Sequence, residues 1–484
     1  MMNLLLYKYE NKRDFITLLI IFLLISLANI LLLSSITNLI ITIPQYLLVF
    51  YLIGKYKFRD AVLLHFSFML VSLSSQKTFG MFEGQELSLF NYGTVKLLGP
   101  IRASYVVNLM FVLISLTKNI KINRNLLFFK MHKIFIWLAA IGTIIGLMGL
   151  LVHPFYTLGN FIFPAIYMYV VISSTYILLS MANKPFFRAC YYLSIIALMA
   201  GIISSFIAYS VFGVTATYGA YDIIYTSDIV TFGAILIAGF LSIKEKIPLF
   251  ISLLLFIIIS VVVMSGKDIF AMFFSLLCLL YCMLFHQKTK MKYTRLIRFS
   301  MPLVSVGILI TLSFFIASGS DMVTYKFQSA ISMFSNDVSE INRSPYVRVA
   351  SLLNIFDEGI RNPLALIFGN GFGGYFEDKL NMFAGMDLEN GGWAAEVVKV
   401  GRFPKGHDTM VSVPLYHGIL GLLLIFRIVY LYIKRIPYNF FCGIAFLWIL
   451  LQFYYNPLYA FMGVFFLMAA EYDINGFNSS VRAS

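Results

Sequence analysis

The chain has 484 residues, of which 60% are apolar and only 12% charged, and its mean hydropathy is +0.87. These values exclude a soluble globular protein and are typical of a membrane protein. The net charge of +14 is dispersed over many short basic segments, so we expect no nucleic-acid partner. The sequence therefore predicts an all-α polytopic membrane protein.

The hydropathy pattern predicts about 12 to 14 membrane-spanning helices, each of about 20 residues. The first apolar run is expected to be a retained helix, and the last two runs form either a hairpin or one broken helix. The expected spans lie near residues 15–33, 36–53, 61–75, 103–117, 134–152, 158–181, 189–212, 223–243, 247–265, 268–285, 300–317, 408–433, 438–454 and 457–470.

Basic residues mark every second connection between these spans. Because cytoplasmic loops of membrane proteins carry an excess of Lys and Arg, both termini are expected in the cytoplasm. The basic loops are also expected to contact anionic membrane lipids. The basic segments on this side fall near residues 8–13, 55–59, 118–133, 184–188, 244–246, 288–298, 434–435 and 482.

One connection is much longer than the others, about 88 residues from Ser318 to Lys405. It is rich in Gly and Arg, and the alternation of basic loops places it outside the cytoplasm. We expect three parts: a transmembrane bundle of about 11 spans over 1–317, a partly helical extracytoplasmic loop domain over 318–406, and C-terminal helices over 407–484. A transporter does not need such a loop, whereas an enzyme that works on one membrane face does.

Several cations on this outer side are candidates for binding an anion, among them Arg343 and Arg402 of the long loop. Lys267 lies in a tight turn between two apolar spans, where it binds an anionic partner or pairs with Asp268. Arg348 follows a helix start with Ser344 as N-cap and Pro345 at the first position. A cation is disfavoured in a first helical turn, so Arg348 points to an anionic ligand.

The same helix is predicted to pack on the bundle through Val349, Leu352, Leu353 and Phe356. Further on, Gly369, Gly371 and Gly374 formally spell a dinucleotide-binding pattern, but its flanking membrane helices exclude a Rossmann fold. These glycines and Gly373 are expected to form a tight turn, or to bring backbone N–H groups to a ligand.

His407 is the best catalytic candidate among the six histidines. It precedes a long helix that is expected to begin around Asp408–Thr409, and the positive end of that helix would keep the imidazole neutral. A neutral imidazole can accept a proton near pH 7. His132, in contrast, is expected in a basic loop. The four cysteines lie in apolar runs and predict no metal site.

Taken together, these motifs resemble the conserved region of the O-antigen ligase and Wzy O-antigen polymerase superfamily. The resemblance covers about residues 345–421 and includes the Arg348 helix start, the glycine segment, Gly406-His407-Asp408 and Gly418-Ile-Leu-Gly421. Two positions depart from the family pattern: Asp408 stands where Asn is usual, and Lys267 stands where members often have Ser-Arg. Lysine keeps the charge but lacks the bidentate guanidinium.

The resemblance implies a glycosyltransferase that uses a polyprenyl-diphosphate-linked glycan as donor in the bacterial cytoplasmic (inner) membrane. Arg348, Lys267, Arg402 and Arg343 would stabilise the diphosphate, while His407, with Asp408 beside it, would orient or deprotonate the acceptor hydroxyl. Tyr375 and other loop aromatics would either stack on sugar rings or anchor the loop at the membrane interface. The diphosphate is already activated, so neither metal nor cofactor is expected. A polymerase is favoured over a ligase, a lipid-linked oligosaccharide flippase is the alternative from another class, and a chain-length regulator and a flippase are the implied protein partners.

Overall fold

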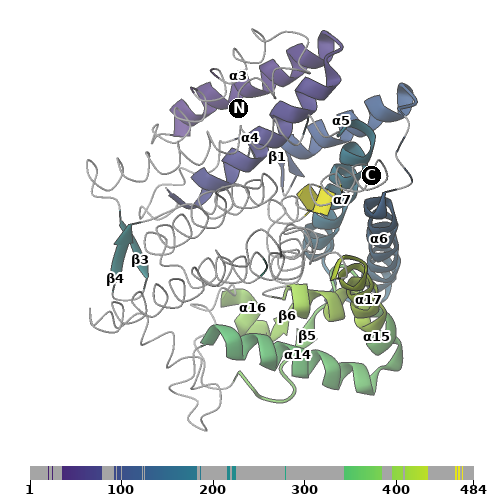
Figure 1. The fold of residues 1–484 in the computed structure, drawn as a ribbon. Helices are drawn as coiled ribbons and strands as arrows, with labels where there is room; N and C mark the ends of the chain where they lie inside the picture. Colours follow the sequence, from purple (N-terminus) through teal and green to yellow (C-terminus); the bar gives the residue numbers. More distant parts are fainter. Residues whose placement is uncertain are drawn as a thin grey trace, which may run out of the picture.

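The computed structural model describes residues 20, 24, 35–78, 92–93, 95–99, 101–120, 122, 124, 126–182, 186, 215–218, 221–224, 278, 343–383, 395–406, 409–433, 464–465, 467–468 and 471. This part of the chain is mostly helical (Figure 1). Among the described residues, three helices are long and apolar enough to cross a membrane: α6 (Leu127–Val152), α7 (Leu158–Met181) and α17 (Thr409–Ile433). The full number of spans, the sidedness and the division into three domains stay predictions.

Six predicted spans are confirmed as helices, namely those near residues 36–53, 61–75, 103–117, 134–152, 158–181 and 408–433. The other eight lie almost entirely outside the described residues. The remaining described helices are α3 (Ser35–Gly54), α4 (Phe58–Thr78), α5 (Ala103–Thr117), α14 (Arg343–Arg361), α15 (Pro363–Phe368) and α16 (Ala395–Val400).

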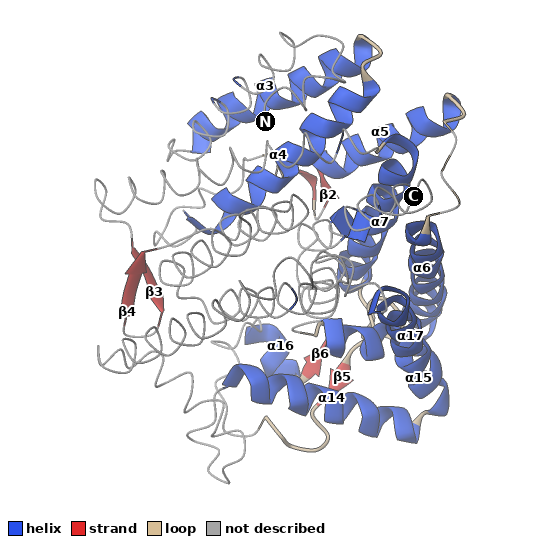
Figure 2. Cartoon of the chain, viewed as in Figure 1, coloured by secondary structure: helices blue, strands red, loops and turns tan. Residues whose placement is uncertain are grey.

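Three short antiparallel strand pairs interrupt the helical pattern (Figure 2). An all-α prediction misses them because each strand has only two to four residues, too few to show an alternating pattern. The pairs are β1 (Lys96–Leu98) with β2 (Ile101–Arg102), β3 (Thr215–Tyr218) with β4 (Tyr221–Ile224), and β5 (Phe376–Glu377) with β6 (Arg402–Phe403).

Helix α6 begins at Leu127, seven residues before the predicted start. Lys130 and Lys133 lower the hydropathy of this first stretch, yet both are exposed while Met131 and His132 between them are buried. The prediction that His132 lies in a loop is therefore wrong. Its Nδ1 instead lies 2.6 Å from the hydroxyl of Thr175 on α7.

Helix α17 is broken at Gly418, where φ is +61° and ψ is −157°. A left-handed φ is accessible to glycine and strained for other residues. The break interrupts the ladder of hydrogen bonds at the carbonyls of Leu415 and Tyr416. Those two carbonyls instead accept from the backbone nitrogens of Asn370 and Gly371, at 2.7 and 3.2 Å. The kink thus lets the segment that contains Asn370 and Gly371 form backbone hydrogen bonds with α17.

That segment, residues 369–374, is named the glycine loop. The nitrogen of Phe372 donates to the carbonyl of Gly142 on α6 at 2.8 Å, and Gly142 lies ten residues, or about 15 Å, from the end of that helix. Non-helical backbone at such depth is tolerated only when its polar groups are bonded within the protein. The glycine loop meets this condition through α6 and α17.

Helices α14 and α15 lie together with β5, β6 and α16 at one end of the three long helices, toward the bottom of Figure 1. This end, where α6 finishes and α7 begins, is named the α14 end. The opposite end, where α6 begins and α17 finishes, is named the basic end. Asn362 caps α15, and Pro363 occupies its first position, so the chain turns sharply between α14 and α15.

Candidate functional site

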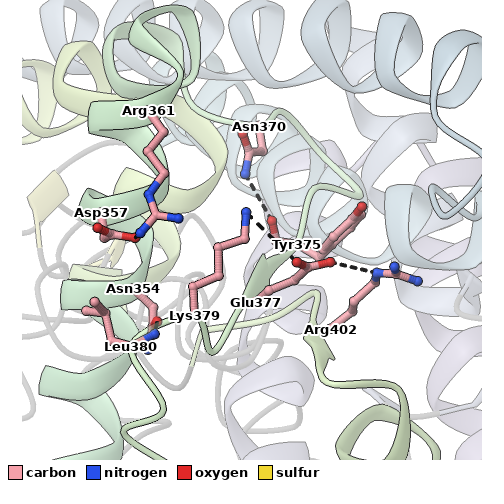
Figure 3. Close-up of polar contacts among 9 residues, drawn as sticks. All are labelled: Asn354, Asp357, Arg361, Asn370, Tyr375, Glu377, Lys379, Leu380 and Arg402. Carbon is pink, nitrogen blue, oxygen red and sulfur yellow. Dashed lines mark hydrogen bonds and ion pairs between the residues drawn. The ribbon is translucent and has the colours of Figure 1, made fainter.

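A charged pair on the antiparallel strands β5 and β6, named the hairpin although α16 lies between them in the sequence, forms the centre of the candidate site. Phe376 pairs with Phe403 and Glu377 with Arg402 across the two strands. The Nε of Arg402 donates to Oε1 of Glu377 at 2.9 Å, and Nζ of Lys379 lies 3.9 Å from Oε2 (Figure 3). The Glu377 carboxylate therefore lies between two cations.

Arg402 also connects this hairpin to the turn between α6 and α7. Its guanidinium carbon lies 3.4 Å from the centre of the Phe155 ring and 5.6 Å from that of Tyr375. Stacking on aromatic faces fixes a guanidinium in position. The bond to Glu377 uses Nε, and the guanidinium carries further N–H groups on its two terminal nitrogens. This geometry suits an arginine that receives an oxyanion.

Two tyrosines and an asparagine line the same region. The hydroxyl of Tyr156 donates to the backbone carbonyl of Asn370 at 2.8 Å, and Nδ2 of Asn370 donates to the carbonyl of Tyr375 at 3.0 Å. The two tyrosine rings meet edge to face at 5.9 Å. Burial raises the pKa of Tyr156, and burial likewise raises the pKa of Tyr375. Both phenols therefore keep their protons at neutral pH.

Glu358, on α14, is a site residue that the sequence prediction missed. One of its carboxylate oxygens is buried, and burial raises the pKa of Glu358 while nearby Lys379 opposes that shift. Glu377 and Asn370 are among its neighbours. A carboxyl group whose pKa is raised can exchange a proton closer to neutral pH. Glu358 lies on the same helical face as buried Ser351 and Asn354. No signal in the sequence pointed to this, because a polar helical face is normally exposed to solvent.

Asn354 and Asp378 hold the hairpin against α14. Nδ2 of Asn354 donates to Oδ1 of Asp378 at 2.8 Å, and Oδ1 of Asn354 accepts from the nitrogen of Leu380 at 3.0 Å. Asp378 also accepts from the nitrogens of Met382 and Phe383 at 2.9 and 2.7 Å. The rings of Phe376 and Phe403 stack on each other, and the ring of Phe383 contacts both, edge to face with Phe403. These hydrogen bonds and ring contacts hold the charged pair in a fixed position relative to α14.

An apolar groove of about 540 Å³ leads away from this cluster, between the last turns of α6 and helix α15. Ile144, Met148 and Phe368 are among its apolar residues, and Tyr156 and Asn370 belong to both the groove and the polar cluster. The site thus joins a charged region to an apolar channel, and this combination suits an amphiphilic molecule.

The glycines predicted to bind substrate have packing roles in the described contacts. Gly371 has φ +69°, and a Cβ there would overlap the backbone nitrogen of Gly146 on α6. A Cβ at Gly373 would lie 3.1 Å from the backbone of Phe161 on α7. The N–H of Gly371 is bonded to Tyr416 and so does not point to a ligand. Their role in substrate binding stays a prediction.

Arg348 is half-buried on α14, which begins at Arg343, two residues earlier than predicted. Arg348 is therefore beyond the first turn, and the argument from the helix dipole is weaker than the sequence suggested. The helix packs on the rest of the protein through Val347, Ala350, Ser351, Asn354 and Ile355.

The packing face predicted for α14 is therefore wrong for two residues: Val349 and Leu353 are 49% and 45% exposed. The buried face includes small and polar residues as well as Val347 and Ile355, and Asn354 on this face bonds to Asp378 and to the backbone of Leu380.

Three of the predicted site residues, His407, Asp408 and Lys267, lie outside the described residues, as does the side chain of Arg343. Helix α17 does begin at Thr409, as predicted, directly after Asp408. Within the described ranges no group of three or more His, Cys, Asp or Glu side chains is placed to hold a metal ion.

No protein-family model matches the chain, and no curated protein sequence matches it.

Proposed function

We propose that the chain is a glycosyltransferase that polymerises polyprenyl-diphosphate-linked oligosaccharide repeat units on the outer face of the bacterial cytoplasmic membrane. The observation that carries the proposal is the shared edge of the charged hairpin and the apolar groove, at Tyr156 and Asn370. A lipid-linked sugar donor has the same two-part chemistry: an apolar tail joined through an anionic diphosphate to a polar glycan.

In the proposed reaction a hydroxyl oxygen of the acceptor glycan attacks the anomeric carbon of the donor. The bond from that carbon to the diphosphate oxygen breaks, the hydroxyl proton passes to a base, and polyprenyl diphosphate leaves. Negative charge develops on the leaving diphosphate, and fixed cations lower the barrier by stabilising it. The proposal gives this role to Arg348 and Arg402, with Lys267 and Arg343 as further candidates.

The proposed base is His407, which lies two residues before α17 in the sequence. Glu358 is a second candidate, because it lies beside Tyr375 and Glu377 and its pKa is raised by burial. Aromatic rings beside carboxylates also suit a sugar, whose C–H faces stack on rings while its hydroxyls donate to carboxylate oxygens.

A complementation experiment tests the proposal. A strain that lacks its own polymerase but makes the matching repeat unit would express the chain, and the length of its surface polysaccharide would be read on a gel. We expect a ladder of long chains from the wild type and single repeats from the empty strain. Deletion of the gene from its own strain separates the alternatives: loss of all polysaccharide from the lipid A core would indicate a ligase instead, and accumulation of lipid-linked units inside the cell would indicate a flippase.

A pair of arginine variants on one helix makes this experiment specific for the site. Arg348→Ala is expected to leave only single repeats at normal protein abundance, and Arg348→Lys to retain part of the ladder. Arg361→Ala is the control, because Arg361 is 59% exposed and pairs with Asp357 at 2.8 Å on the surface of α14. Equal ladders from the two alanine variants would remove Arg348 from the site.

A further inference from the structure

A second groove, distinct from the candidate site, lies between α6 and α17 toward the basic end. Its volume is about 550 Å³. Lys130 and Lys133 of α6 and Arg427 of α17 lie along it near the helix ends, while Trp137, Leu420 and Leu424 lie deeper in the bundle. The groove therefore changes from cationic to apolar along its length.

The three cations converge on this groove without a balancing acid. None of the described residues that line it is acidic, and no ion pair joins Lys130, Lys133 or Arg427 to another residue that the structure describes. All three are exposed, and Lys133 rests over the ring of Phe129 at 4.9 Å. Three positive charges held together at one site attract a multivalent or well-placed anion.

The length of the groove matches one leaflet of a bilayer. From Lys130 to Ile141 the helix advances 11 residues, which is about 16 Å at 1.5 Å per residue. Half of a hydrocarbon core about 30 Å thick is about 15 Å. A molecule with its anion at Lys130 would therefore reach the bilayer midplane at Ile141, where the glycine loop begins to fill the space between the same two helices.

We propose that this groove binds one anionic phospholipid of the surrounding bilayer. The phosphate contacts Lys130, Lys133 and Arg427, and an acyl chain lies along Trp137, Leu424 and Leu420. Basic recesses between membrane helices recognise such headgroups by charge, and a neutral phospholipid lacks the net charge to do so. The proposal rests on the membrane location of α6 and α17 alone and not on the proposed glycosyl transfer.

Lipid binding to the purified full-length chain tests the proposal, with phosphatidylglycerol as the anionic probe and phosphatidylcholine as the neutral one. The variant Lys130→Gln/Lys133→Gln/Arg427→Gln removes the three charges. The control Lys55→Gln/Lys118→Gln/Arg124→Gln removes the same charge from exposed cations elsewhere in the basic segments. Native mass spectrometry counts retained lipids, and a titration in detergent measures affinity.

We expect one phosphatidylglycerol per chain in the wild type and the control, and about 100-fold weaker binding in the groove variant. This estimate takes about 1 kcal/mol for each basic residue near an anionic lipid surface and 1.4 kcal/mol for each factor of ten. Phosphatidylglycerol binding to the groove variant as tight as to the control would overturn the proposal, and so would equal affinity of the wild type for phosphatidylcholine.

A second measurement does not depend on whether the triple variant folds. Trp137 is 61% exposed and lines the groove, so its fluorescence reports an acyl chain there. In a chain with Trp393→Phe and Trp448→Phe, brominated phosphatidylglycerol is expected to quench Trp137 at lower mole fraction than brominated phosphatidylcholine. Identical quenching curves would show that the groove does not select an anionic lipid, and the proposal would fail.

Discussion

Helices α6 and α17 leave a space between them toward both of their ends, and the two spaces differ in what occupies them. At the α14 end, the glycine loop fills the space between the helices, and Gly142 and Gly146 of α6 leave room for it. At the basic end, Lys130, Trp137 and Arg427 leave a groove of about 550 Å³. Between α6 and α17, small residues let the glycine loop fill the space at one end, whereas large side chains leave an open groove at the other end.

The glycine loop and the charged residues that follow it in the sequence also have different roles. The glycines of residues 369–374 serve the fit between helices, whereas the charged residues that follow them, Glu377, Lys379 and Arg402, meet on the hairpin at the protein surface. Substitutions in the two groups are therefore expected to fail in different ways: the first through folding and the second through activity.

The largest effect is expected at the glycine loop. Gly371→Val places a β-branched residue at φ +69° and drives its Cβ into the backbone of Gly146, which cannot move without breaking α6. We expect no folded protein on size-exclusion chromatography. Gly159→Ala is the control, because nothing lies within 4 Å of a Cβ there. A normal elution profile for Gly371→Val would show that the loop is not packed as described.

The next effect concerns the proposed base. His407→Ala is expected to lower the polymerisation rate by a factor of about 10²–10⁴, the usual worth of a general base. His407→Gln keeps a hydrogen bond but accepts no proton, so it is expected to be as slow. Rates are measured with purified protein and lipid-linked donor. A near-normal rate for the glutamine variant would limit His407 to positioning and direct the search for a base to Glu358.

Arg402 comes third. Arg402→Ala removes the cation held by Glu377 and Phe155 and is expected to lower the rate by about 10²–10³, the usual worth of one fixed group that stabilises developing negative charge. Lys379→Ala is the control on the same hairpin, since its ammonium lies 3.9 Å from Glu377 and is 40% exposed. Equal losses in both variants would indicate that the hairpin, rather than the guanidinium, matters.

The smallest expected effect is a change in how thermal stability depends on pH, and it concerns Glu358. A carboxyl whose pKa is raised by folding stabilises the protein below its unfolded pKa, and this contribution is lost as pH rises through the folded value. Glu358→Gln cannot ionise. Its melting temperature is therefore expected to exceed that of the wild type at pH 8, and the difference to shrink as pH falls toward 5. Differential scanning fluorimetry across that range measures the sign, and a constant difference would contradict the raised pKa.

Much of this arrangement was readable from the sequence because it depends on local pattern. Hydropathy located α5, α7 and α17 within a few residues, and Ser344 with Pro345 marked the start of α14 within two residues. The entry of the glycine loop into the bundle was not readable, because it depends on a kink in α17 at Gly418, a position that is far away in the sequence. For the same reason Glu358 resembled an ordinary surface acid until the hairpin covered it.

The groove between Lys130, Lys133 and Arg427 could not be predicted from the sequence either. Lys130 and Lys133 predicted only the orientation of a loop, because topology rules count charges without placing them. Arg427 lies in the middle of an apolar run, and the sequence does not show which residues of other helices lie near it. Only the packing of α6 against α17 brings the three together.

The most direct test of the central claim is a reaction with purified components. The full-length chain in detergent is given a synthetic polyprenyl-diphosphate-linked repeat unit, with and without a chelator, and products are resolved by mass spectrometry. The account predicts lipid-linked dimers and longer oligomers, release of polyprenyl diphosphate, and the same rate with the chelator. Unchanged monomer in the presence of correctly folded protein, or oligomers that form only when magnesium or manganese is restored, would contradict it.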